Sequence, residues 1–95
     1  MAISAEDWAV IPDLAVEVIS PNDRYGDVIA KMYEYFDYGV REVWVVEPEH
    51  RVVNVYTTPT DVEIHTHEQS LETPLLPGLT ISLADVFARR PAAAK

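Results

Sequence analysis

The sequence contains no cysteine. This absence excludes disulfide bonds and the thiolate ligands of many structural zinc sites. No apolar run approaches the roughly 20 residues that a membrane-spanning helix needs. The N-terminus also lacks a basic region followed by an apolar one, so we expect no signal peptide and a cytoplasmic protein.

Basic residues are scarce as well. Lys and Arg number 7 against 16 Asp and Glu, which gives a formal net charge of −9 over 95 residues. This charge disfavours non-specific binding to nucleic acid. It does not exclude a nuclease, because carboxylates gathered around a metal site make it acidic until the cation binds. With 48% hydrophobic residues, the composition predicts one domain over residues 1–90, followed by a disordered tail at 91–95.

One acidic residue lies inside the most apolar strand signal of the chain. Residues 14–19 are apolar and rich in β-branched residues apart from Glu17, and Pro12 and Pro21 bound the segment. This pattern predicts a buried strand over about residues 13–20. A buried carboxylate is costly unless it is paired or holds a metal, so Glu17 is the first candidate functional residue.

A helix is predicted directly after this strand. The segment 20–23 has the composition of a turn, and Asn22 or Asp23 can cap the helix that follows. Apolar residues then recur at helical spacing over about residues 25–38, and Gly39 is a suitable C-terminal stop. The apolar face consists of Val28, Ile29, Met32, Tyr35 and Phe36.

Lys31 lies two turns into this helix, beside its apolar face. If the helix covers the strand face that carries Glu17, the carboxylate and the ammonium meet in a partly buried position. Such a pair suits phosphodiester hydrolysis. The carboxylate helps to hold Mg²⁺ or Mn²⁺, while the ammonium orients water and offsets negative charge in the transition state.

Structural roles are open for the same residues. Asp27 and Lys31 can form an ordinary surface pair across one helical turn. Glu17 can be buried and satisfied by Lys31, Arg24 or a tyrosine hydroxyl without any catalytic role. Asp13 shares the strand face of Glu17 but lies about 13 Å away, at ~3.3 Å per residue. One metal ion therefore reaches both acids only if a bulge or bend intervenes.

The rest of the chain predicts a sheet. Strands are expected at 41–47, 52–57 and 62–67, the first two as a hairpin, and irregular chain then leads into a short strand at 79–83. A short helix is expected at 84–90. Two strands joined by a helix form a right-handed parallel crossover. The sequence therefore predicts an α/β or α+β fold, with a mixed sheet, a helix over one face, a β-meander and a short C-terminal helix.

Three polar residues alternate along the predicted edge strand, namely Glu63, His65 and His67. Two histidines and a glutamate are able to bind Zn²⁺. Successive side chains on one face of a strand are about 6.6 Å apart, however, which is long for a single ion. A solvated polar face is the alternative interpretation.

Several segments, taken in order along the chain, form a series of motifs. They are Pro12–Pro21 (PDLAVEVISP), then Asp27, Lys31 and Tyr35, then Gly39–Val46 (GVREVWVV), Pro74–Leu79 (PLLPGL) and Leu83–Phe87 (LADVF). This series resembles the Uma-type endonuclease family of the PD-(D/E)xK restriction-endonuclease-like superfamily. The resemblance covers about residues 12–87.

The resemblance implies a metal-dependent nuclease fold that acts on DNA. In that family Glu17 matches the acid of the second motif, and Ile19 stands where a lysine is often found. Lys31 resembles the lysine that has migrated to the helix, and Asp13 matches the Pro-Asp pair at the strand entry. Glu47 departs from the family pattern, in which an aspartate is usual before the proline.

Family members also have N-terminal structure that includes an earlier strand with another metal-binding carboxylate. Only eleven residues precede Pro12 here, so we expect the chain to correspond to the C-terminal half of such a domain. A domain truncated in this way leaves a sheet edge open, and open edges pair with other chains. We therefore expect a homodimer or larger homo-oligomer, in which Asp13 or an acid of the partner chain completes the site.

Two functions follow from these observations. The first is a metal-dependent endonuclease, in which Glu17 and Asp13 bind Mg²⁺ or Mn²⁺ and Lys31 assists the attacking water. The second is a catalytically inactive nuclease-fold remnant that serves as an oligomerisation or binding module, with Glu17 and Lys31 as a structural ion pair. They differ in whether Glu17 faces an open cleft with a second acidic group within about 4–5 Å.

Overall fold

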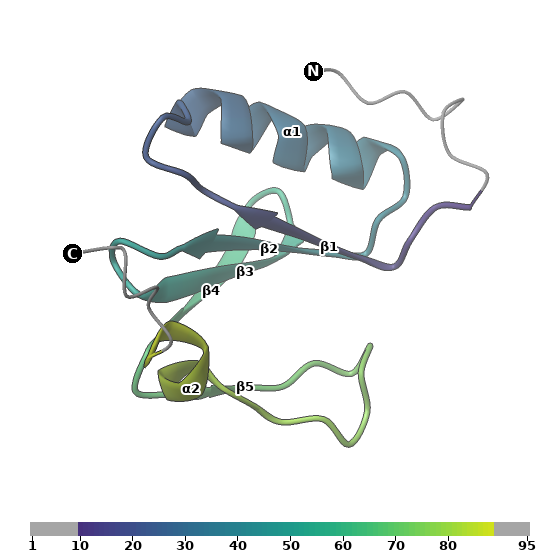
Figure 1. The fold of residues 1–95 in the computed structure, drawn as a ribbon. Helices are drawn as coiled ribbons and strands as arrows, with labels where there is room; N and C mark the ends of the chain where they lie inside the picture. Colours follow the sequence, from purple (N-terminus) through teal and green to yellow (C-terminus); the bar gives the residue numbers. More distant parts are fainter. Residues whose placement is uncertain (1–9, 89–95) are drawn as a thin grey trace.

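A four-stranded sheet separates a long helix on one face from the C-terminal segment on the other (Figure 1). The computed structural model of the protein describes residues 10–88. Its elements are β1 (Leu14–Val18), α1 (Tyr25–Asp37), β2 (Glu42–Glu47), β3 (Val52–Thr58), β4 (Asp61–Thr66), β5 (Ser70–Leu71), β6 (Ile81–Ser82) and α2 (Leu83–Ala88). The predicted tail at 91–95 lies outside the described residues. Within residues 10–88 no helix is long and apolar enough to cross a membrane.

The sheet is mixed, as predicted. Its strand order is β1-β2-β3-β4. The first pair is parallel and is joined by α1, whereas the other two pairs are antiparallel. The crossover and the meander are therefore both confirmed. The strand β5 was not expected, and it pairs with β6 in a separate two-stranded sheet.

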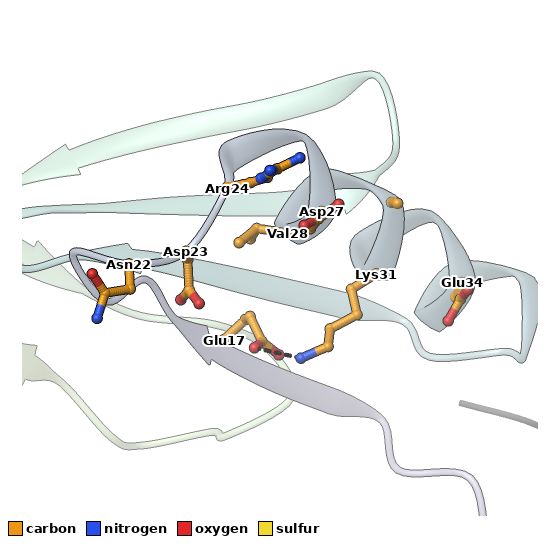
Figure 2. Close-up of a pocket in the computed structure, with 9 residues that line it drawn as sticks. Glu17, Asn22, Asp23, Arg24, Asp27, Val28, Lys31 and Glu34 are labelled. Carbon is orange, nitrogen blue, oxygen red and sulfur yellow. Dashed lines mark hydrogen bonds and ion pairs between the residues drawn. The ribbon is translucent and has the colours of Figure 1, made fainter. Parts of the chain in front are cut away.

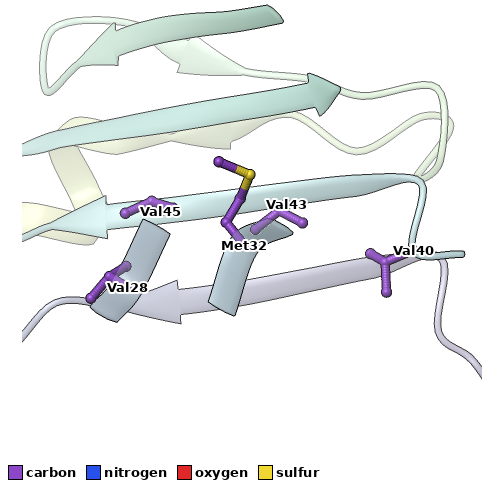
Figure 3. Close-up of a cluster of buried hydrophobic side chains, with 5 residues drawn as sticks. All are labelled: Val28, Met32, Val40, Val43 and Val45. Carbon is purple, nitrogen blue, oxygen red and sulfur yellow. The ribbon is translucent and has the colours of Figure 1, made fainter. Parts of the chain in front are cut away.

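The helix α1 packs on the sheet through its predicted apolar face. Val28 and Met32 are buried against Val43 and Val45 of β2, which are both fully enclosed (Figure 3). Gly39 ends the helix with a φ of +104°, a backbone conformation that favours glycine because it has no Cβ. This packing holds α1 against the covered face of the sheet.

The expected side-chain cap of α1 is absent. The N-cap residue is Arg24, and it makes no capping hydrogen bond through its side chain. The carboxylate of Asp23 accepts a hydrogen bond from the Ser20 amide instead, at 2.8 Å. Asp23 thus closes the turn that precedes the helix, a role that competes locally with capping.

The opposite face of the sheet has its own core. Trp44 of β2 packs there with Leu71 of β5 and Leu83 of α2. The same face buries Glu42, whose carboxylate accepts hydrogen bonds from the Trp44 indole at 2.6 Å and from the Thr73 hydroxyl at 2.9 Å. Glu42 thereby ties the C-terminal segment to β2.

The strand predicted to be buried is covered on one face only. Val16 and Val18 are 51% and 55% exposed on the face opposite α1. The second core lies over β2 and β3, and Leu14 is the residue of β1 that packs against it. Because β1 is an edge strand, the C-terminal segment does not extend far enough to cover its remaining valines.

Replacing Thr73 by valine removes one of the two donors that satisfy the buried Glu42 carboxylate. An unsatisfied buried acceptor costs about 1–3 kcal/mol, so we expect Thr73→Val to lower the free energy of unfolding by that amount in urea titrations followed by circular dichroism. The matched control is Thr80→Val, which removes an exposed hydroxyl bonded to Glu72, with an expected loss below about 0.5 kcal/mol. Equal losses would contradict the role of Glu42.

Candidate active site

Glu17 and Lys31 meet on the helix-covered face of the sheet. The Nζ atom of Lys31 lies 2.9 Å from Oε2 of Glu17, and the two side chains are 34% and 20% exposed, respectively. Figure 2 shows the lysine extending from α1 toward the carboxylate on β1. The two residues are therefore on the same side of the sheet, as strand alternation and the apolar face of the helix predicted.

Tyr35 is the second partner of the same carboxylate. Its hydroxyl donates a hydrogen bond to Oε1 of Glu17 at 3.0 Å. Tyr35 follows Lys31 by one helical turn, so both side chains project from the same side of α1. Of the three partners that the sequence offered for Glu17, the structure provides the lysine and a tyrosine hydroxyl, one on each carboxylate oxygen.

The surroundings of Tyr35 keep its hydroxyl protonated. The pKa of Tyr35 is raised from 10.0 to about 12, mainly by burial and then by the hydrogen bond to Glu17 and the charge of that carboxylate. The phenol therefore remains a hydrogen-bond donor across the neutral pH range. Tyr56 of β3 has a pKa raised to about 12 as well, mainly by burial and then by a hydrogen bond with Tyr25.

An open pocket of about 580 Å³ borders the Glu17–Lys31 pair, between β1, the turn after it and α1. Its lining is predominantly charged, and it combines several carboxylates with two cationic side chains. The acidic lining residues are Glu17, Asp23, Asp27 and Glu34, and the basic ones are Arg24 and Lys31 (Figure 2). The pair thus faces an open cleft and is not sealed inside the core.

The oxygen donors of this pocket suit a hard divalent cation. Mg²⁺ is usually held by one or two carboxylates together with water and substrate phosphates. Glu17 supplies one such carboxylate, and Asp23 and Asp27 line the same pocket. Within residues 10–88, no three His, Cys, Asp or Glu side chains form a metal-binding group. The pocket thus offers carboxylate oxygens of the kind that an open magnesium site uses, but the described residues do not gather them into a metal-binding group.

Asp13 does not belong to this pocket. Its backbone carbonyl accepts hydrogen bonds from the amides of Arg41 and Glu42, and its exposed carboxylate lies 4.0 Å from the Arg41 guanidinium. The register between β1 and β2 is continuous from Leu14 onward, so no bulge brings Asp13 toward Glu17. The structure places Asp13 where the chain enters β1.

The polar residues of the β4 region do not form a zinc group either. Nε2 of His65 lies 3.2 Å from a carboxylate oxygen of Glu63. His67 follows the last residue of β4. In the part of the chain that the structure describes, these residues are not among any metal-binding group of three.

The sequence alone did not assign Tyr35 to the carboxylate or the neighbouring acids to the pocket. The spacing of Asp27, Lys31 and Tyr35 at i, i+4 and i+8 does indicate a common location, because it aligns the three residues along one side of the helix. Asp23 gave no such signal, since its position depends on how the turn after β1 folds.

Comparison with known proteins identifies the family of this chain. A family described as "Uma2: Putative restriction endonuclease" matches residues 2–84. The chain belongs to the Uma2 family. This confirms the resemblance that the motifs carried. A comparison with curated proteins gave no match.

The fold of this Uma2 family member is also found in a solved structure. That protein is described as a "putative nuclease belonging to DUF820" from Anabaena variabilis ATCC 29413. The two structures agree with a TM-score of 0.75 at 22% sequence identity, over 85% of this chain and 46% of the other. The likeness confirms the predicted mixed α+β fold, and the chain spans about half the length of that protein.

The raised pKa of Tyr35 predicts a stability loss at alkaline pH. The folded state keeps the proton up to about pH 12, whereas an unperturbed tyrosine loses it near 10.0. The contribution is therefore complete below pH 10 and disappears as the pH rises through 12. We expect Tyr35→Phe to flatten the decline of the free energy of unfolding between these pH values, measured by urea titration.

The exposed Tyr33 provides the control for this measurement. Tyr33→Phe makes the same chemical change two residues away on α1 and should leave the decline as steep as in the unmodified chain. Identical pH dependence in the Tyr35→Phe variant and the unmodified chain would contradict the raised pKa of Tyr35.

Proposed function

We propose that this chain carries the chemistry of a metal-dependent endonuclease that cleaves DNA phosphodiester bonds. The observation that supports it is the Glu17–Lys31 pair at 2.9 Å beside an open acidic pocket. Membership of the Uma2 family and the fold of the chain support the same reaction class. In this proposal Glu17 is the metal ligand, and Lys31 is the catalytic cation.

In the proposed mechanism Glu17 and Lys31 have different roles. A bound Mg²⁺ or Mn²⁺ supplies Lewis acidity and lowers the pKa of water. Glu17 holds this cation, with Asp23 and Asp27 lining the same pocket. The ammonium of Lys31 donates hydrogen bonds to a phosphate oxygen and to the attacking water, and offsets the negative charge that develops during hydrolysis.

The charge of the chain makes DNA binding dependent on the cation. With a net charge of −9 and four acidic residues around the pocket, the cation-free site repels phosphates. Arg24 and Lys31 are the basic residues that line the pocket, and in this proposal they contact the DNA backbone. The cytoplasmic location expected from the sequence stays a prediction.

We also propose that the protein assembles through β1. Among residues 10–88, β1 pairs with β2 alone, so its outer edge has backbone groups that no strand covers. Val16 and Val18 add half-exposed apolar surface beside this edge. A second copy that pairs through the same edge satisfies both features. An acid of that copy is the proposed additional metal ligand, because Asp13 lies at the entry to β1 and outside the pocket.

The enzymatic proposal predicts cleavage that depends on both members of the pair. We expect the purified chain to nick supercoiled plasmid with Mg²⁺ or Mn²⁺ and not with EDTA. Glu17→Gln and Lys31→Met should each lower the rate at least about 100-fold, in line with the loss of a charge-stabilising catalytic group. Asp13→Asn changes an acid that lies outside the pocket, so we expect it to leave the rate unchanged in the same assay.

The control for this assay is Glu68→Gln, which neutralises an exposed acid outside the pocket and should leave the rate unchanged. If all variants share one background rate, the enzymatic proposal is wrong. The chain is then the non-catalytic module, and the pair is a structural ion pair. One observation favours this second role, since Lys31 and Tyr35 already satisfy both oxygens of Glu17.

The assembly proposal predicts a dimer or larger homo-oligomer in light scattering coupled to size-exclusion chromatography. Val18→Lys places a charge beside the open edge, and lysine at strand edges opposes strand pairing, so we expect this variant to be monomeric. Val86→Lys makes the same change at an exposed valine of α2 and should keep the assembly. A monomeric unmodified chain would disprove association through β1.

A further inference from the structure

The two partners of Glu17 differ in how firmly the fold holds them. Tyr35 packs against the core formed by Val28, Met32, Val43 and their neighbours. Its ring has only two side-chain torsions, and it is partly buried against this core. Lys31 has a flexible four-carbon stem, is one-third exposed at 34%, and lines the open pocket. The hydroxyl is therefore a fixed partner, whereas the ammonium is able to move away without disturbing the core.

The hydrogen bonds are divided between the carboxylate oxygens in the same way. The hydroxyl of Tyr35 binds Oε1, and the ammonium of Lys31 binds Oε2. Oε2 is thus the oxygen whose present partner borders the pocket. A divalent cation that enters the pocket competes with the ammonium for this oxygen, because two positive charges in contact with one carboxylate repel each other.

We propose that Tyr35 is a positioning residue for the Glu17 carboxylate, which it holds through Oε1 while Oε2 exchanges Lys31 for a divalent cation. This inference rests on the proposed metal-dependent function, and it adds a role for a residue that does not itself touch the cation. Lys31, once displaced, is free to reach a phosphate in the pocket.

This role has a known physical basis, because a residue that hydrogen-bonds a metal-binding side chain holds that side chain in the orientation the metal needs. A carboxylate that binds a metal through one oxygen keeps its plane and rotamer more firmly when the other oxygen accepts a hydrogen bond. Loss of such an outer partner typically lowers metal affinity about 10–100-fold.

The test is direct binding of Mn²⁺ alone to the full chain, followed by electron paramagnetic resonance of the free ion. We expect Tyr35→Phe to raise the dissociation constant at least about tenfold. Tyr33→Phe, the matched change at an exposed position of α1, should leave it unchanged. Lys31→Met should lower the dissociation constant, because this change removes the competing charge. Glu17→Gln should abolish binding at this site.

The outcomes separate this inference from the proposal on which it rests. If the unmodified chain does not bind Mn²⁺, or binds it equally after Glu17→Gln, the metal-dependent function and the role of Tyr35 both fail. If binding requires Glu17 but is unchanged by Tyr35→Phe, the positioning role alone fails. Weaker binding by Lys31→Met would overturn the exchange at Oε2.

A measurement on the unmodified sequence keeps the test independent of variant folding. In the chain labelled with ¹³C at the tyrosine ζ-carbons, Mg²⁺ should shift the Tyr35 resonance with the dissociation constant of the metal site. The resonance of Tyr33 should stay in place. Binding of Mg²⁺ without any shift at Tyr35 would overturn the positioning role.

Discussion

A carboxylate on the covered face of β1 needs partners, and this need constrains how α1 lies on the sheet. The strand register places Glu17 beside Val45, which offers no side-chain hydrogen bond. The polar partners therefore come from the helix, and they lie one turn apart at Lys31 and Tyr35. Apolar packing alone permits α1 to slide or rotate slightly over valines. Two hydrogen bonds to one carboxylate remove that freedom, because a burial without them leaves a charge uncompensated.

The chain contains a second acid of low exposure, and the contrast between the two acids separates structure from chemistry. Glu42 is 5% exposed, accepts hydrogen bonds from the neutral donors of Trp44 and Thr73, and lies between packed layers. Glu17 is paired with a cation and borders an open pocket. The hydrogen bonds around Glu42 hold the packed layers in a single arrangement and leave no room for another partner. Those of Glu17 allow one partner to be replaced, which a catalytic or metal-binding carboxylate requires.

The sequence predicted the features that depend on periodicity. Alternation along β1 and the apolar face of α1 together placed Glu17 against Lys31, and the crossover followed from the order of the elements. The features that it missed depend on tertiary neighbours. A two-residue strand such as β5 has no period of its own and exists because Leu71 is buried in the second core. Asp23 has two local hydrogen-bonding options of similar quality, and composition does not decide between the turn and the cap.

The exposed valines of β1 are another feature that the sequence did not predict. They also connect the proposed assembly with the Glu17–Lys31 site. An apolar run of this length does not distinguish a strand covered on both faces from an edge strand with one open face. In this chain Val16 and Val18 face outward while Glu17, between them, faces the helix. A strand paired with the open edge has side chains about 4.5–5.5 Å from those of β1 at directly opposed positions. In the proposed assembly, a strand that pairs along the edge of β1 therefore places side chains beside Glu17 as well as beside the valines, so the charge of those side chains would act on the candidate active site.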